Sequence, residues 1–204
     1  MRVAFDTTVL WGAFHRPAGP NFALLALAAQ RTPVLDGFIT DVVGGEFWWR
    51  ATQQGVKGPG QAVPRTYSEQ ELEPFLEAFE VLFEPANMAR APLSRSLGRY
   101  AGLVGLSLGE FLHAVTGRDR EALLSSVTAT FPVTFESMDL ADLHILCGAL
   151  QNGAEIICSS DSKMLNYDPI GSIRITSPVA LTDELGLIDS STSSAEVPRT
   201  ASWR

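Results

Sequence analysis

Short apolar runs recur along the chain, separated by longer segments whose apolar residues follow helical spacing. Short runs without polar alternation are typical of strands that are buried on both faces. The longer segments predict helices between the strands, which favours a parallel α/β sheet. The predicted strands are residues 2–5, 34–40, 131–135, 156–158 and 172–176.

The most informative stretch lies near the C-terminus and reads as a helix followed by a strand. Asp139 is a suitable N-cap, because its carboxylate can accept from the free N–H groups of a first helical turn. Residues 140–150 are almost all apolar, and Asn152-Gly153 provides a stop signal. Asp142 falls in the first turn of this apolar helix, where an unpaired buried carboxylate costs several kcal/mol, so it needs a partner.

Two further acids come shortly after buried strands, and a third lies in the helix that follows another predicted strand. Asp6 comes after residues 2–5, and Asp161 comes soon after residues 156–158. Glu46 falls in the second turn of a helix that Thr40 or Asp41 caps. In a parallel α/β sheet the strand-to-helix junctions share one edge, where ligands bind. We therefore expect these acids to meet there, joined by Asp142 if residues 131–135 form the preceding strand.

The middle of the chain is predicted to be a helical insertion at about residues 55–130. It opens with a Gly-, Gln- and Pro-rich loop at 53–64, and Ser68 and Glu71 then form a capping box for a helix reaching Phe83. Helical spacing continues through residues 85–130, interrupted by glycines. We expect one domain over residues 1–188 and a disordered tail at 189–204, which is rich in Ser and Thr.

Composition narrows the class of protein. The chain has 204 residues, 46% of them hydrophobic, which is enough for one core, and a formal net charge of −8 argues against a broad basic surface for nucleic acid. No signal peptide opens the chain and no apolar run reaches transmembrane length, so we expect a cytoplasmic protein with no membrane partner. Cys147 and Cys158 are expected to be buried, reduced thiols.

Several residues have a structural interpretation that competes with a functional one. His144 lies on an apolar helix and is expected to be packed and hydrogen-bonded. The chain has only three histidines and no His/Cys cluster with metal-ligand spacing, which argues against zinc. Asp139 is expected to act as a cap, and Trp48 and Trp49 to lie in the core or an interface.

Two segments resemble the PIN-domain nucleases. Residues 3–10, Val-Ala-Phe-Asp-Thr-Thr-Val-Leu, resemble the family's opening strand and acid, and residues 141–161 resemble its acid-bearing helix and following strand–acid unit. Glu46 occupies the place of the family's second acid. The resemblance covers about residues 1–50 and 131–182 and implies a twisted parallel sheet between helices, interrupted here by the helical insertion.

The resemblance also implies an activity, which is metal-dependent hydrolysis of RNA with Mg²⁺ or Mn²⁺. It assigns Asp6, Asp142 and Asp161 as metal ligands and Glu46 as the group that orients the attacking water. Thr8 and Lys163 are candidate contacts to the substrate phosphate; Thr8 stands where the family often has Asn or Ser, and Lys163 lies near the position of a further acid. Many members are toxins neutralised by an antitoxin protein, and many dimerise, so both partners are candidates here.

Two other functions remain open. A PIN-like domain that binds RNA or a protein without cleaving is favoured by the acidic net charge and by the missing acid near Lys163. A haloacid-dehalogenase-like phosphatase on a similar sheet would need a second aspartate two residues after its nucleophile, and Thr8 is at that position.

Overall fold

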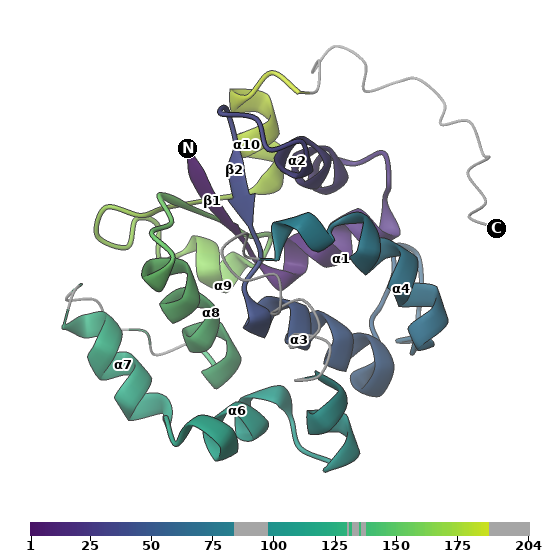
Figure 1. The fold of residues 1–204 in the computed structure, drawn as a ribbon, viewed down its shortest axis with the longest axis vertical. Coiled ribbons are helices and arrows are strands. Elements are labelled where there is room, and N and C mark those ends of the chain that lie inside the picture. The colour runs from purple at the N-terminus through teal and green to yellow at the C-terminus, as the bar shows by residue number, and fades with distance from the viewer. Residues whose placement is uncertain (84–97, 130, 132–134, 136–137, 188–204) are drawn as a thin grey trace.

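The protein is an α/β fold built on a four-stranded, all-parallel sheet (Figure 1). The computed structural model describes residues 1–83, 98–129, 131, 135 and 138–187. Within them the strand order is β2-β1-β3-β4, with β1 at Arg2–Phe5, β2 at Asp36–Phe38, β3 at Ile156–Cys158 and β4 at Arg174–Thr176. The sequence predicted all four of these strands.

Alternate residues of the strands enter two separate cores, because successive side chains point to opposite faces of a sheet. Val3, Phe5 and Ile156 pack into the first core. Ala4 and Ile157 pack into the second. Both faces are therefore covered, as expected for a parallel sheet.

Helices from the first half of the chain cover the first core, together with one from the end. Figure 1 shows α1, α2 and α4 gathered on this side of the sheet. The elements are α1 (Thr7–His15), α2 (Pro20–Ala29), α3 (Asp41–Trp49), α4 (Glu69–Ala78) and α10 (Pro178–Glu184).

The second core lies under helices from the later part of the chain. The elements are α7 (Arg120–Thr128), α8 (Leu140–Gln151) and α9 (Ser162–Leu165). Between the two groups, α6 (Leu108–Thr116) packs against both α3 and α8. A five-residue π-helical segment, Arg50–Gln54, follows α3 directly.

Two local predictions are wrong. The helix beginning after Ser68 ends at Ala78 rather than at Phe83, because Phe79 leaves the helical conformation. A 3₁₀ turn at Glu80–Leu82 then brings Phe83 against Ile39, where it makes a bridge beside the sheet. The cap of α2 is Gly19 rather than Asn21, because Pro20 with its fixed φ takes the first helical position.

Other predictions fall wholly or partly outside the described residues. Residues 132–134 of the predicted strand at 131–135 are not described, and neither Phe131 nor Phe135 is assigned to a strand. The tail at 189–204 also lies outside, so the predicted domain limits remain untested. Cys147 and Cys158 are buried and unpaired with each other, as expected. No helix in the described part of the chain is long and apolar enough to cross a bilayer.

Candidate active site

The strand order creates a switch point between β1 and β3. The chain leaves β1 for β2 on one side, and β3 enters on the other side. In open parallel sheets such a point opens a crevice at the carboxyl ends of the strands. Phe5 pairs with Cys158 in register, so Asp6 and Ser159 are neighbours just beyond the sheet.

Asp6 is buried and is held by donors from both neighbouring strand ends. Its Oδ1 accepts from the Thr7 backbone N–H at 2.7 Å, which makes Asp6 the N-cap of α1. Its Oδ2 accepts from the hydroxyls of Thr8 at 2.8 Å and Ser159 at 2.6 Å. These charge-assisted hydrogen bonds compensate for removing the carboxylate from water.

Glu46 reaches the same edge from α3 and is also buried. The Thr7 hydroxyl donates to its Oε2, and the Arg50 guanidinium pairs with its Oε1 at 2.6 Å. Burial raises the pKa of Glu46 to about 7, against the opposing effects of Arg50 and Thr7; the negative charges of Asp6 and Asp142 raise the pKa further. The carboxyl group therefore exchanges its proton near neutral pH.

Asp142 is the N3 residue of α8 and is half-buried. Its backbone N–H donates to Asp139 Oδ1 at 2.9 Å, and its own Oδ2 accepts from the Asp139 N–H at 3.4 Å. Burial raises the pKa of Asp142 to about 6, and the charges of Asp139, Asp6 and Asp161 contribute in the same direction. Asp139 is the cap of this helix, as the sequence predicted.

Asp161 is the N-cap of α9, where its Oδ1 accepts from the Lys163 backbone N–H at 2.8 Å. Its own backbone N–H donates to the Ser159 hydroxyl at 3.0 Å. The hydroxyl of Thr8 accepts a hydrogen bond from the Ser160 backbone N–H at 2.8 Å. Hydroxyl groups therefore connect the segments that follow β1 and β3. The contact that Lys163 makes with Asp161 comes from its backbone N–H.

The structure brings Asp6, Glu46, Asp142 and Asp161 to one edge of the sheet, as the sequence predicted from their positions. Beyond the effect of burial, Asp6 and Asp142 raise the pKa of Glu46, and Asp6 and Asp161 raise that of Asp142, so every one of the four acids takes part in at least one such pair. Like charges that raise a neighbouring pKa are typical of acids that lie close together.

The chemistry of this donor set fits a hard divalent cation. Carboxylate and hydroxyl oxygens are the ligands that Mg²⁺ and Mn²⁺ favour. As the side chains stand, no three His, Cys, Asp or Glu residues of the described ranges form a group able to hold a metal ion. A cation shared by Asp6, Asp142 and Asp161 would therefore require these side chains to be arranged differently from their arrangement in this structure.

Sequence reasoning missed three residues of this edge: Thr7, Arg50 and Ser159. Arg50 lies four residues after Glu46, the spacing at which helical side chains meet, so its ion pair had a visible signal. Ser159 follows the apolar run of β3, where a polar side chain must face the edge. The Thr7 contact with Glu46 joins residues 39 apart and had no local signal.

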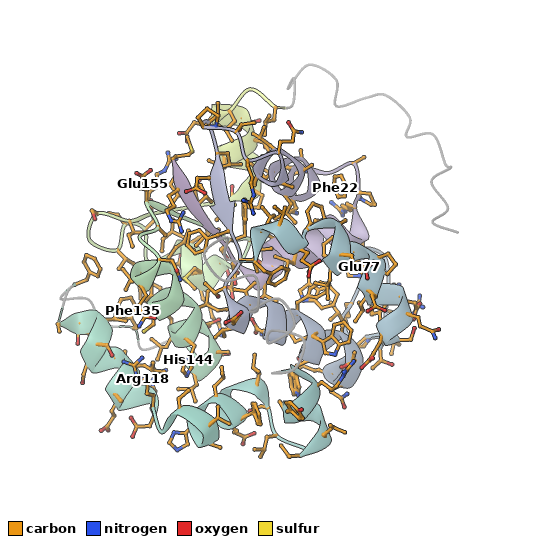
Figure 2. All side chains as sticks on the ribbon, viewed as in Figure 1. Phe22, Glu77, Arg118, Phe135, His144 and Glu155 are labelled. Atoms are coloured by element: carbon orange, nitrogen blue, oxygen red, sulfur yellow. The ribbon has the colours of Figure 1, made fainter. Side chains whose placement is uncertain are left out.

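The prediction for His144 is only half right. The side chain is packed as expected, but its Nε2 is buried and makes no hydrogen bond. Burial lowers the pKa of His144, and the positive charge of Arg118 contributes to the decrease. Figure 2 shows Arg118 beside the His144 region of α8, on the side that faces α7. His144 therefore belongs to the contact between α7 and α8, and none of the hydrogen bonds described above for the acidic site involves it.

Comparisons with protein-family models, with curated proteins and with solved structures found no match to this chain. The fold and site define a parallel α/β protein with acidic residues at the carboxyl edge of its sheet, beside the topological switch point. Any functional assignment therefore depends on these residues and their arrangement.

Proposed function

We propose that this chain is a PIN-type ribonuclease that hydrolyses RNA phosphodiester bonds with Mg²⁺ or Mn²⁺. The observation that carries the proposal is the convergence of Asp6, Glu46, Asp142 and Asp161 at the carboxyl ends of β1 and β3. Burial and neighbouring negative charges raise the pKa of Glu46 and Asp142, so the charged acids are costly without a cation, and this supports a cation-binding role.

Within this proposal, Asp6, Asp142 and Asp161 hold the cation, and the hydroxyls of Thr8 and Ser159 fix the orientation of Asp6. When bound, the metal supplies charge neutralisation at the phosphate and lowers the pKa of water. Glu46 orients the attacking water and takes its proton on a carboxylate oxygen. The water oxygen forms a bond to phosphorus as the P–O bond to the leaving ribose oxygen breaks, and that ribose oxygen is protonated from solvent. A pKa of about 7 suits Glu46 to this role.

The test is cleavage of end-labelled single-stranded RNA by the purified protein with Mn²⁺. We expect the wild type to cleave and Asp6→Asn to lose more than about 100-fold of the rate, since changes even behind a metal ligand cost 10–100-fold. Asp161→Asn is the second variant, because a substitution at this half-buried position disturbs folding less than one at the buried Asp6. Equal RNA loss with all three proteins would identify a contaminating nuclease and contradict the proposal.

A second candidate is a PIN-like module that binds RNA or a protein without cleaving it. The ion pair between Arg50 and Glu46 favours this alternative, because Arg50 already occupies an oxygen of the carboxylate that would orient the attacking water. Binding of labelled RNA with no cleavage in Mn²⁺ would support it. The toxin role, the antitoxin partner and the homodimer remain predictions from the family resemblance. The cytoplasmic location and a phosphate contact by Lys163 remain predictions from the sequence.

A further inference from the structure

A cavity of about 330 Å³ adjoins the acidic site where α3, α6 and α8 meet. Glu46 and Asp139 line it, so it continues directly from the acidic edge into the helical insertion. A larger cavity of about 500 Å³ lies between α1, α2 and α4, but none of the four acids lines it. The smaller cavity is therefore the one placed to hold part of a substrate bound at the acids.

The walls of this cavity combine one aromatic ring with apolar and hydrogen-bonding groups. The ring of Trp49 is half-buried, and its indole N–H donates to the Leu106 carbonyl at 3.1 Å, which fixes the orientation of the ring. Leu108 and Leu140 supply apolar surface, and Gln54 contributes an exposed amide at the rim.

The polar ends of α6 and α8 in this wall are already satisfied. Glu110 accepts from the Ser107 N–H and hydroxyl, and Asp139 accepts from the Asp142 N–H. The groups left to meet a ligand are the Trp49 ring, the Gln54 amide and the half-exposed Arg50 guanidinium, which lines the cavity beside its ion-pair partner Glu46.

We propose that this cavity binds one unpaired nucleobase of the RNA, next to the phosphate held at the acids. This inference rests on the proposed ribonuclease function and defines its substrate class as RNA that is single-stranded at that nucleotide. The base stacks on Trp49, the amide of Gln54 donates to and accepts from the base edge, and Arg50 contacts the adjoining phosphate. The volume lies at the lower end of the range for small-ligand sites, as one nucleotide requires.

The experiment uses single-stranded RNA in which one abasic residue is moved along the sequence. We expect one position near the cleaved bond at which the abasic residue lowers kcat/KM about tenfold for the wild type, the loss typical of one stacked base. Gln54→Ala lowers the rate on intact RNA and shrinks this positional effect. Gln53→Ala is the matched control, since Gln53 is its exposed neighbour and does not line the cavity.

A second pair of variants separates stacking from mere packing. Trp49→Phe keeps an aromatic face but loses the hydrogen bond to Leu106, whereas Trp49→Leu loses the face as well. We expect the positional effect to survive in Trp49→Phe and to disappear in Trp49→Leu. Equal positional effects in both variants, or equal behaviour of the Gln53 and Gln54 variants, would overturn the inference.

Failure of this inference can be told apart from failure of the proposed activity. Equilibrium binding of the same RNAs to Asp161→Asn, measured by fluorescence anisotropy, reports the base requirement without depending on cleavage. Position-dependent binding with no cleavage by the wild type would retain the base site and reject the nuclease. Cleavage without any positional effect, or cleavage of duplex RNA at the same rate, would retain the nuclease and reject the base site.

Discussion

Three of the helices that the structure describes begin with a capping box, and the pKa of the box's acid is lowered in two of them and raised in the third. In α4 and α6 the N3 acids, Glu71 and Glu110, accept hydrogen bonds from the cap serines, and these bonds lower the pKa of each carboxyl. In α8 the N3 acid is Asp142, and burial together with nearby acids raises its pKa to about 6.

The local motif is the same in all three helices, so the difference comes from tertiary surroundings. Glu71 and Glu110 face solvent, where the capping bonds dominate. Asp142 is half-buried and lies within electrostatic range of Asp139, Asp6 and Asp161, so burial and these negative charges destabilise its charged form in the fold. A helix cap alone does not require that placement, and this is the reason to regard Asp142 as a functional acid.

The largest expected effect is on cleavage. Asp142→Asn keeps the shape of the side chain but removes its charge, so we expect a loss of about 100-fold or more in kcat/KM on single-stranded RNA. Glu71→Gln makes the equivalent change in the box of α4, and we expect its rate to equal that of the wild type. A similar loss in both variants would mean that the capping role, rather than the acidic site, matters for activity.

The second effect is the change in the free energy of unfolding without metal, and its sign differs between substitutions in the capping boxes of α8 and α4. We expect Asp142→Asn to raise the free energy of unfolding at pH 8 by about 1 kcal/mol, after allowing for solvent screening of a half-buried group. Glu71→Gln should lower the free energy of unfolding, because a neutral amide oxygen accepts the two capping bonds more weakly than a carboxylate and cannot pair with Arg65. Urea denaturation in EDTA measures both; destabilisation by Asp142→Asn would contradict the comparison.

The pH dependence of that stability difference gives a third test. Asp142 has a raised pKa in the fold, so between about pH 4 and pH 6 the folded state binds more protons than the unfolded state at this site. Its destabilising contribution is therefore absent below about pH 4 and complete above about pH 6. We expect the advantage of Asp142→Asn over the wild type to appear across that window. An advantage that is constant with pH would exclude ionisation as its cause.

The smallest expected effect concerns Glu46. Thr7→Val removes the hydroxyl that donates to Glu46, so the pKa of this carboxyl should rise further above about 7. We expect the acidic limb of the kcat profile to move to higher pH by less than about one unit, the scale of one hydrogen bond. Thr7→Ser, which keeps the hydroxyl, should restore the wild-type profile; an unmoved limb in Thr7→Val would remove Glu46 from the proton transfer.

Local patterns were sufficient to predict the elements that carry the site. The helix α8 begins after Asp139, whose side chain caps it, and ends at Asn152 before Gly153, which has a positive φ. Thr40 caps α3. The parallel sheet then places Asp6 and Asp161 together, because strand ends share an edge. Contacts between distant segments were not predictable: the end of α4 depends on how residues 79–83 pack, and the Thr7–Glu46 bond depends on how α1 meets α3.

The most direct measurement is calorimetric titration of Mn²⁺ into the metal-free protein at neutral pH. We expect saturable binding to the wild type, the same binding to Glu71→Gln, and none to Asp142→Asn. If the wild type shows no saturable binding, or if Asp142→Asn binds Mn²⁺ as the wild type does, the acids at the ends of β1 and β3 do not form a cation site.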